Sequence, residues 1–239
     1  MAKRHLKRLA APKTWKIKRK GPKFISNSLP GPHSLDTGVP LAILLKEILN
    51  YANTTKEVKK ILNTNEIKID GKIRKNFRFP VGIFDTIEFT NTKEYFRVVL
   101  NEKSKIDLVK IKKEETLLKP CKIIGKTIVK GKLQLNLFDS KNILVDKNSY
   151  KVGDSVLLLL PEQKITKHLK LDKKSTIFLI GGNHIGEIGT VEDIFENKII
   201  YKDNKDNLIE TLKKYAFVVG DDKPLITLSK DEPNEKHQN

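Results

Sequence analysis

The sequence predicts an α+β fold that is mainly β and is preceded by a basic arm. Three observations support this prediction. Apolar residues recur at helical spacing between residues 39 and 62. From residue 67 onward, short runs of alternating apolar and polar residues are separated by Gly, Asp, Asn and Ser, which is typical of strands joined by turns. Residues 1–35 hold ten Lys and Arg, no Asp or Glu, and too few apolar side chains for a core of their own.

The charge of the whole chain indicates the chemistry of its partner. The 239 residues include 47 Lys and Arg against 29 Asp and Glu, a formal net charge of +18. Such an excess repels itself unless a polyanion neutralises it, so a nucleic acid is the leading candidate and a membrane surface the second. No stretch approaches the roughly 18 consecutive apolar residues that a spanning helix needs. The single cysteine, Cys121, excludes an intrachain disulfide and fits a reducing, cytoplasmic location.

The arm comprises residues 1–38. Pro and Gly interrupt it six times between residues 12 and 32, so no long helix is expected and the segment alone should be mobile. Cations that neutralise phosphates release counterions, so binding should weaken steeply with salt; the alternative is a solvated extension without a binding role. Trp15 either stacks on an unpaired base or packs against a neighbouring domain. The candidate binding residues are Lys3, Arg4, Lys7, Arg8, Lys13, Trp15, Lys16, Lys18, Arg19, Lys20 and Lys23.

Residues 39–92 form the second predicted unit, which consists of two helices and a basic hairpin. Pro40 suits the first turn of a helix with apolar positions at Leu41, Leu44, Leu45, Ile48 and Leu49. Thr54 and Glu57 form a capping box for the second helix, and Asp70-Gly71 suits a tight hairpin turn. Three lysines share the outer helix face, which costs stability unless an anion lies alongside, although it is also typical of a solvated face. The candidate binding residues are Lys56, Lys59, Lys60, Lys68, Lys72, Arg74, Lys75 and Arg78.

Residues 93–174 and 175–239 are predicted as two further β units. In the first, Cys121 is expected to be a small core residue. The second contains IFLIGGNHIGEIGTVEDIF, whose glycines suggest a dinucleotide site. The residues that follow continue a strand pattern instead of opening a helix, so tight turns and close backbone approach explain the glycines better. The candidate loop residues are Gly181, Gly182, Asn183, His184, Gly186 and Gly189.

Nothing in the sequence indicates catalysis. The five histidines are far apart, and none has metal-ligand spacing to another histidine or to Cys121. No nucleophile stands with a base, and no carboxylate pair differs from the general surface charge. We therefore expect no catalytic residue, no metal site, no cofactor and no small-molecule substrate.

Several of these stretches resemble known families. Residues 39–90 resemble the small RNA-binding module first named for ribosomal protein S-four, and the segment around Gly186 and Gly189 is similar to the KOW motif. MAKRHLKRLAAPKTWKIKRK, PGPHSLDTGVPLAILL, GGNHIGEIG and KPLITL together resemble the small-subunit ribosomal protein family S-four-E of archaea and eukaryotes.

The resemblance implies a fold. It consists of a basic N-terminal arm (1–38), an S-four-like RNA-binding module (39–92), a central β domain (93–174), and a KOW-containing β-barrel with a polar tail (175–239). The last two would be small SH3-like β-barrels.

The resemblance also implies a function. The expected function is that of a structural constituent of the small (30S) ribosomal subunit, cytoplasmic and without catalysis, that binds and stabilises folded rRNA beside neighbouring ribosomal proteins. Two alternatives remain open. One is an RNA-modifying enzyme of the pseudouridine synthase type, whose arginine-leucine-aspartate-like motif is not visible here, and the other is a KOW-bearing transcription-elongation factor.

Overall fold

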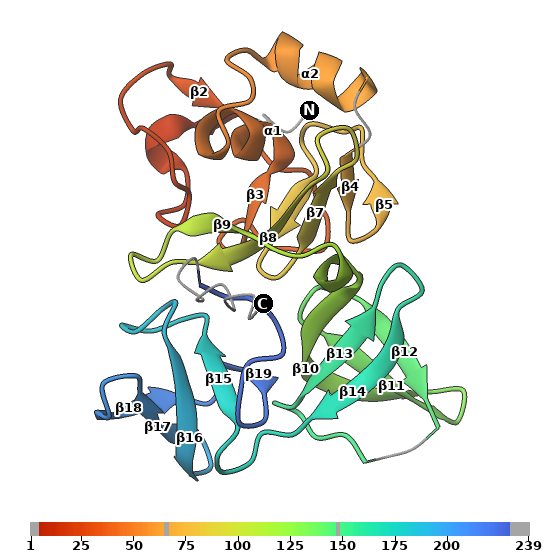
Figure 1. The fold of residues 1–239 in the computed structure, drawn as a ribbon, viewed down its shortest axis with the longest axis vertical. Coiled ribbons are helices and arrows are strands. Elements are labelled where there is room, and N and C mark those ends of the chain that lie inside the picture. The colour runs from red at the N-terminus through yellow and green to blue at the C-terminus, as the bar shows by residue number, and fades with distance from the viewer. Residues whose placement is uncertain (1–4, 65–66, 147–148, 230–239) are drawn as a thin grey trace, which may run out of the picture.

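Three antiparallel five-stranded sheets make up most of the described chain, and helices are few. The structure is a computed structural model, and it describes residues 5–64, 67–146 and 149–229. Figure 1 shows the first sheet and the helices at one end of the long axis, with the second and third sheets at the other end. The prediction of a mainly β fold is confirmed.

The first sheet has the strand order β5-β4-β7-β8-β9. Its strands are β5 (Lys72–Ile73), β4 (Ile67–Ile69), β7 (Thr86–Phe89), β8 (Glu94–Leu100) and β9 (Ile106–Lys110). The tight turn predicted at Asp70-Gly71 joins β4 to β5, with φ values of 51° and 73°. The domain boundary predicted after residue 92 falls in the β7–β8 turn, and strand pairing continues across it to Lys110. Alternation alone marks strands but does not say which strands pair, so the sequence did not reveal this continuity.

The helical segments are short and precede this sheet in the chain. They are α1 (Leu41–Ile43), the π-helical turn η2 (Leu44–Ile48) and α2 (Thr55–Thr64). The predicted capping box of α2 is formed, because the backbone N–H of Glu57 donates to Thr54 Oγ1 (3.2 Å) while Glu57 Oε2 accepts from the N–H of Asn53 (2.8 Å). The continuous helix predicted from residue 41 is interrupted, since the turn that follows α1 is wider.

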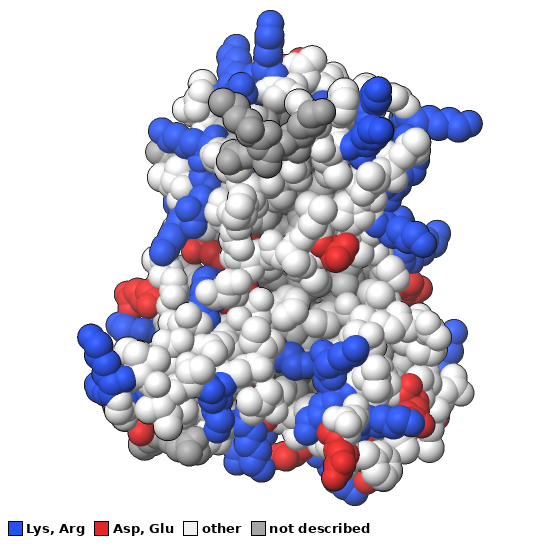
Figure 2. Space-filling view, turned by 180° about the vertical axis from the view of Figure 1, so that it is seen from behind, with Lys and Arg blue, Asp and Glu red and all other residues white. Residues whose placement is uncertain are grey.

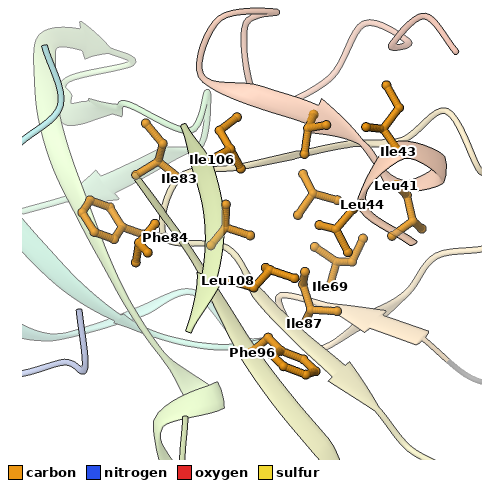
Figure 3. Packing of buried hydrophobic residues seen from close by; sticks show 14 of the residues in the cluster. Leu41, Ile43, Leu44, Ile69, Ile83, Phe84, Ile87, Phe96, Ile106 and Leu108 are labelled. Carbon is orange, nitrogen blue, oxygen red and sulfur yellow. The ribbon is translucent and has the colours of Figure 1, made fainter. Parts of the chain in front are cut away.

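The core of this end lies between the helical segments and the first sheet. Figure 3 shows Leu41 and Leu44 in one cluster with Ile69 and Ile87 of the sheet. Val58 of α2 is also fully buried in this cluster. The apolar face of the helical segments therefore meets the sheet, and the lysine face of α2 is left toward solvent.

The second sheet has the order β12-β11-β10-β13-β14 and a separate core. Its strands are β12 (Asn142–Val145), β11 (Lys132–Leu137), β10 (Leu118–Val129), β13 (Ser155–Leu159) and β14 (Lys164–Leu169). The turn η3 (Glu114–Leu117) leads into β10, which pairs with β13 through its first half and with β11 through its second half. Cys121 is buried in this core, as the sequence predicted.

The third sheet has the order β18-β17-β16-β15-β19. Its strands are β18 (Leu208–Leu212), β17 (Lys198–Asp203), β16 (Ile188–Ile194), β15 (Thr176–Leu179) and β19 (Ala216–Gly220). Phe178 of β15 and Phe217 of β19 contact the Phe84 ring, with centroid distances of 5.4 and 4.6 Å. Aromatic packing of this kind joins the third sheet to the core of the first.

The arm is folded against the rest of the chain over its described residues. Its elements are β1 (Leu6–Lys7), η1 (Arg8–Ala10), β2 (Phe24–Ile25), which pairs with β1, and β3 (Gly38–Pro40), which pairs with β6 (Pro80–Gly82). Trp15 is fully buried, and its indole N–H donates to the carbonyls of Leu35 (3.1 Å) and Gly38 (2.9 Å). The sequence predicts that the arm alone is mobile. In the folded chain the arm is packed instead, because Trp15 anchors it in the apolar core.

No helix within residues 5–64, 67–146 and 149–229 is long and apolar enough to cross a membrane.

Candidate nucleic-acid interface

Exposed lysines of the arm cover one part of the surface. Figure 2 shows Lys and Arg side chains projecting from the upper part of the back face, where Asp and Glu are scarce. The exposed arm lysines are Lys7, Lys13, Lys16, Lys18, Lys20 and Lys23. Lys3 and Arg4 lie outside the described residues. These lysines are free to meet an anion, apart from Lys16, whose Nζ lies 3.1 Å from Asp107.

Three other candidate residues of the arm serve the fold. The sequence left two alternatives for Trp15, stacking on a base or packing inside the protein. Trp15 packs in the core, and its buried ring leaves no face for a base. Arg8 is buried, and its guanidinium lies 3.1 Å from Glu47 of η2. The Arg19 guanidinium donates to the carbonyls of Ala11 (2.7 Å) and Pro12 (2.6 Å). These contacts hold the arm in one shape and thereby position its exposed lysines.

The helix α2 presents its three candidate lysines to solvent. Lys56, Lys59 and Lys60 are exposed, and none has an ion pair with a described acidic side chain. Lys59 Nζ lies 5.1 Å from the centroid of the Phe77 ring, which contributes a cation–π contact but no charge compensation. The repulsion between these lysines is therefore uncompensated in the described chain, as expected for a surface that meets a polyanion.

The hairpin β4–β5 and the residues after it continue this surface. Lys72 and Lys75 are exposed, whereas Lys68 is half-buried with its Nζ 3.6 Å from Glu88. Arg74 lies over a ring, with its Cζ 4.4 Å from the centroid of Phe79. Arg78 Nε donates to the carbonyl of Asn27 (3.0 Å), which ties the hairpin to the arm. We call Lys56, Lys59, Lys60, Lys72, Arg74 and Lys75 the module cations.

The glycine-rich loop connects β15 to β16, and much of it is packed. Gly186 has a φ of 88°, and a Cβ at that position would lie 2.6 Å from the carbonyl carbon of Asn101 in the β8–β9 turn. A Cβ at Gly181 would lie 2.2 Å from the ring of Tyr215, and one at Gly189 would lie 2.4 Å from Tyr201. These glycines are required for close packing inside the protein.

The side chains of the loop extend this internal packing. His184 Nδ1 is 2.9 Å from Glu187 Oε1, while the Tyr201 hydroxyl donates to Glu187 Oε2 (3.0 Å). Burial, together with this carboxylate, raises the pKa of the Tyr201 hydroxyl above its ordinary value. Gly182 and Asn183 are exposed, and the His184 side chain is 41% exposed despite its contact with Glu187, so the tip of the loop at residues 182–184 is open to a partner.

Comparison with known proteins now identifies the family. The model of ribosomal family S4e matches residues 92–165, and that of the RS4NT domain matches residues 2–36. The small ribosomal subunit protein eS4 of Methanococcus maripaludis is 39% identical over an alignment of 240 residues that covers 94% of this chain and 97% of that protein. The eS4 protein of Methanopyrus kandleri is 40% identical over 252 residues, with 96% and 97% covered. This chain belongs to the S4e family.

A solved structure agrees with this assignment. The crystal structure of the 30S ribosomal protein S4e from Thermoplasma acidophilum is similar with a TM-score of 0.67 at 28% sequence identity, and covers 77% of this chain and 95% of that chain. The resemblance to S-four-E is thereby confirmed. S4e proteins are structural components, so the prediction that this chain is not an enzyme is confirmed as well.

One group of residues in this S4e chain was missed by the sequence prediction. It is a buried charge cluster that joins the arm, the first sheet and the second sheet. Lys119 Nζ lies 2.6 Å from Asp70, 2.5 Å from Asp85 and 3.1 Å from Asp139. Lys141 Nζ reaches Asp70 (3.0 Å) and Asp139 (2.8 Å) as well. Apart from Asp139 and Lys141, the partners are about 20 or more residues apart in sequence, so no local spacing signals them.

The cluster lowers the pKa of two of its carboxylates, those of Asp85 and Asp139. His33 Nε2 lies 2.9 Å from Asp85 Oδ1 and adds the contact with the arm. Burial would raise the pKa of Asp85, but His33 and Lys119 outweigh it and hold that pKa well below its usual range. Within the described residues no group of three or more His, Cys, Asp or Glu is arranged to hold a metal ion. The cluster is therefore an ion-pair network that fixes the two sheets relative to each other.

Proposed function

We propose that this S4e protein is a structural constituent of the small (30S) ribosomal subunit that binds and stabilises folded small-subunit rRNA in the cytoplasm. The names of the relatives support a ribosomal role. The observation that carries RNA binding is the set of exposed lysines on the arm, α2 and the β4–β5 hairpin without acidic partners in the described chain. Most contacts would go to phosphate and sugar, which set position, while the shape of the folded RNA gives specificity.

The proposed arrangement assigns a task to each part. The S-four-like module presents the module cations, and the arm supplies a second basic strip that Trp15 and Arg8 hold in place. The second and third sheets would be SH3-like barrels that act as a rigid spacer. The loop tip at Gly182 and Asn183 would face RNA or a neighbouring ribosomal protein.

The salt dependence of RNA binding tests this proposal. The probe is small-subunit rRNA purified from Methanococcus maripaludis, with affinity measured by filter binding at several KCl concentrations. Each phosphate contact contributes about 0.7 to 0.9 to the slope of log K against log salt. Replacing Lys56, Lys59 and Lys60 together by Met should therefore reduce the slope by about 2 to 3.

A matched control removes the same charge elsewhere. Lys130, Lys170 and Lys205 are exposed in turns of the second and third sheets and in the linker between them. Their replacement by Met should leave the slope nearly unchanged. Equal effects of the two triple variants would refute the assigned surface, and absence of binding by the unaltered protein would refute the function. Co-sedimentation with RNA polymerase instead of 30S particles would favour the elongation factor, and turnover in an RNA-modification assay would favour the synthase.

A further inference from the structure

A cavity of about 360 Å³ lies between the β4–β5 hairpin and the second sheet. Pro32, Ile69, Phe79, Leu160 and Pro161 give it apolar walls, and Lys72 and Arg74 are among its polar lining residues. Pockets of this size are typical of sites for small organic groups. Five lining side chains are apolar and eight are polar or charged, so the site suits a group with both an apolar face and polar edges. The cavity adjoins the module cations, so a group carried by the RNA would reach it.

Arg74 is unusual among the arginines of the described chain. Each of the others donates at least one side-chain hydrogen bond: Arg8 and Arg97 to acidic or carbonyl oxygens, Arg19 and Arg78 to carbonyl oxygens. Arg74 has no such bond among the described residues; its buried Nε has no acceptor, which is also true of Nε in Arg8 and Arg97. Its guanidinium lies over the Phe79 ring and lines the cavity with it. Guanidinium planes and aromatic rings are the surfaces on which proteins stack unpaired bases.

The charges around the cavity discriminate between a phosphate and a base. Three carboxylates line it, those of Asp70, Asp85 and Asp139, and all are bound to lysines of the buried charge cluster. Three cations, Lys72, Arg74 and Lys141, line it as well, so the lining carries no net positive charge to offset the desolvation of a buried phosphate, whereas an uncharged base loses less on burial. The amino and imino N–H groups of a base are donors that a carboxylate accepts, and Asp70 is the most exposed of the three, at 15%. A base therefore suits the interior, and its phosphate suits the exposed Lys72 at the rim.

We propose that this cavity holds one unstacked base of the bound RNA, with the Arg74–Phe79 pair as its stacking surface and Lys72 as its phosphate contact. The inference rests on the proposed RNA binding and adds a site that reads a single flipped nucleotide. Within the described residues no side-chain hydrogen bond ties Arg74 to another group, so its guanidinium plane can stack on a base that arrives with the RNA.

The test separates stacking from charge by means of two variants. Arg74→Lys keeps the charge but removes the planar group, so the salt slope for the Methanococcus maripaludis rRNA should stay the same. The affinity extrapolated to 1 M salt, where the phosphate term vanishes, should fall about tenfold, as expected for loss of one stacked base. Lys75→Met is the matched control, because Lys75 is adjacent, exposed and not among the lining residues. It should lower the slope and leave the extrapolated affinity unchanged.

Two results would overturn the inference. One is an extrapolated affinity that Arg74→Lys leaves within twofold of the unaltered protein. The other comes from ultraviolet cross-linking of the complex followed by trypsin digestion. The proposal predicts a nucleotide adduct on the tryptic peptide that begins at Phe79. Absence of this adduct, when adducts form elsewhere on the chain, would also refute the site. If the unaltered protein binds no rRNA, the proposed function fails instead, so the two failures are distinguishable.

Discussion

Removing the amine at the centre of the buried charge cluster should destabilise the whole protein. The side chains of Lys119 and Asp85 are each only 2% exposed. In Lys119→Met, Asp70 and Asp139 keep Lys141, whereas Asp85 keeps no lysine and retains only His33 and the N–H of Gly82. Removing one partner of a buried ion pair typically costs about 3 to 5 kcal/mol because the other charge stays buried. For a chain of this size, that corresponds to a decrease in Tm of roughly 6 to 20 °C.

The dependence on pH gives this expectation a second, independent readout. In the unaltered protein the pKa of Asp85 is held below its unfolded value, so its contribution is present above about pH 4 and is lost as the pH falls through the folded pKa. In Lys119→Met the folded pKa of Asp85 rises, and a protonated carboxyl needs no counterion. The unfolding free energies of the unaltered protein and of Lys119→Met should therefore differ most at pH 7, and the difference should become smaller toward pH 3.

Urea denaturation followed by circular dichroism measures both effects. Lys164→Met is the control, since Lys164 is exposed and its ion pair with Glu162 is at the surface, so the midpoint should not move. A difference below about 1 kcal/mol at pH 7, or one that does not change between pH 7 and pH 3, would show that the cluster does not stabilise the fold.

Three further perturbations have defined outcomes, each measured by urea denaturation. Gly186→Ala combines a positive φ with a clash against Asn101 and should lower the unfolding free energy by about 2 to 4 kcal/mol. Gly131→Ala is the control: it also has a positive φ, but the added Cβ meets open space, so the loss should be about 1 to 2 kcal/mol. Equal losses would contradict the packing of the loop. Trp15→Phe leaves the buried carbonyl of Gly38 and the partly buried carbonyl of Leu35 without their donor and should cost about 2 to 3 kcal/mol. A neutral result would mean that the indole does not anchor the arm. Burial lowers the pKa of Lys122 to about 8, so the folded state releases a proton before the unfolded state and stability should rise by about 2 kcal/mol from pH 8 to pH 10. Lys122→Met should abolish that rise, and its persistence would assign it to another group.

The sequence predicted what local spacing encodes. The turn at Asp70-Gly71 and the capping box of Thr54 and Glu57 depend on residues within four positions of each other, and both are present in the structure. The exposure of the α2 lysines followed from the helical period, because the apolar positions had to face the core.

Contacts between distant residues were not predictable in the same way. Arg8 looked like one more cation of the arm, but its acceptor Glu47 lies 39 residues away. Lys119 and Lys122 occur in a basic strand that reads as surface, and only the approach of the arm, the hairpin and β19 buries them. The cavity beside Arg74 has the same origin, since its walls come from four separated parts of the chain.

The anchoring of the arm has a consequence for the making of the protein. The Thr14 carbonyl accepts from the N–H of Ile106, and Lys16 pairs with Asp107 across 91 residues of sequence. Residues 14–16 therefore lack these two contacts until β9 has been synthesised, roughly 5 to 20 seconds later at ordinary elongation rates. The contacts of the arm with Leu35, Gly38 and Glu47 are available earlier, so the arm is first anchored close to itself in sequence and reaches its final position only when β9 is complete.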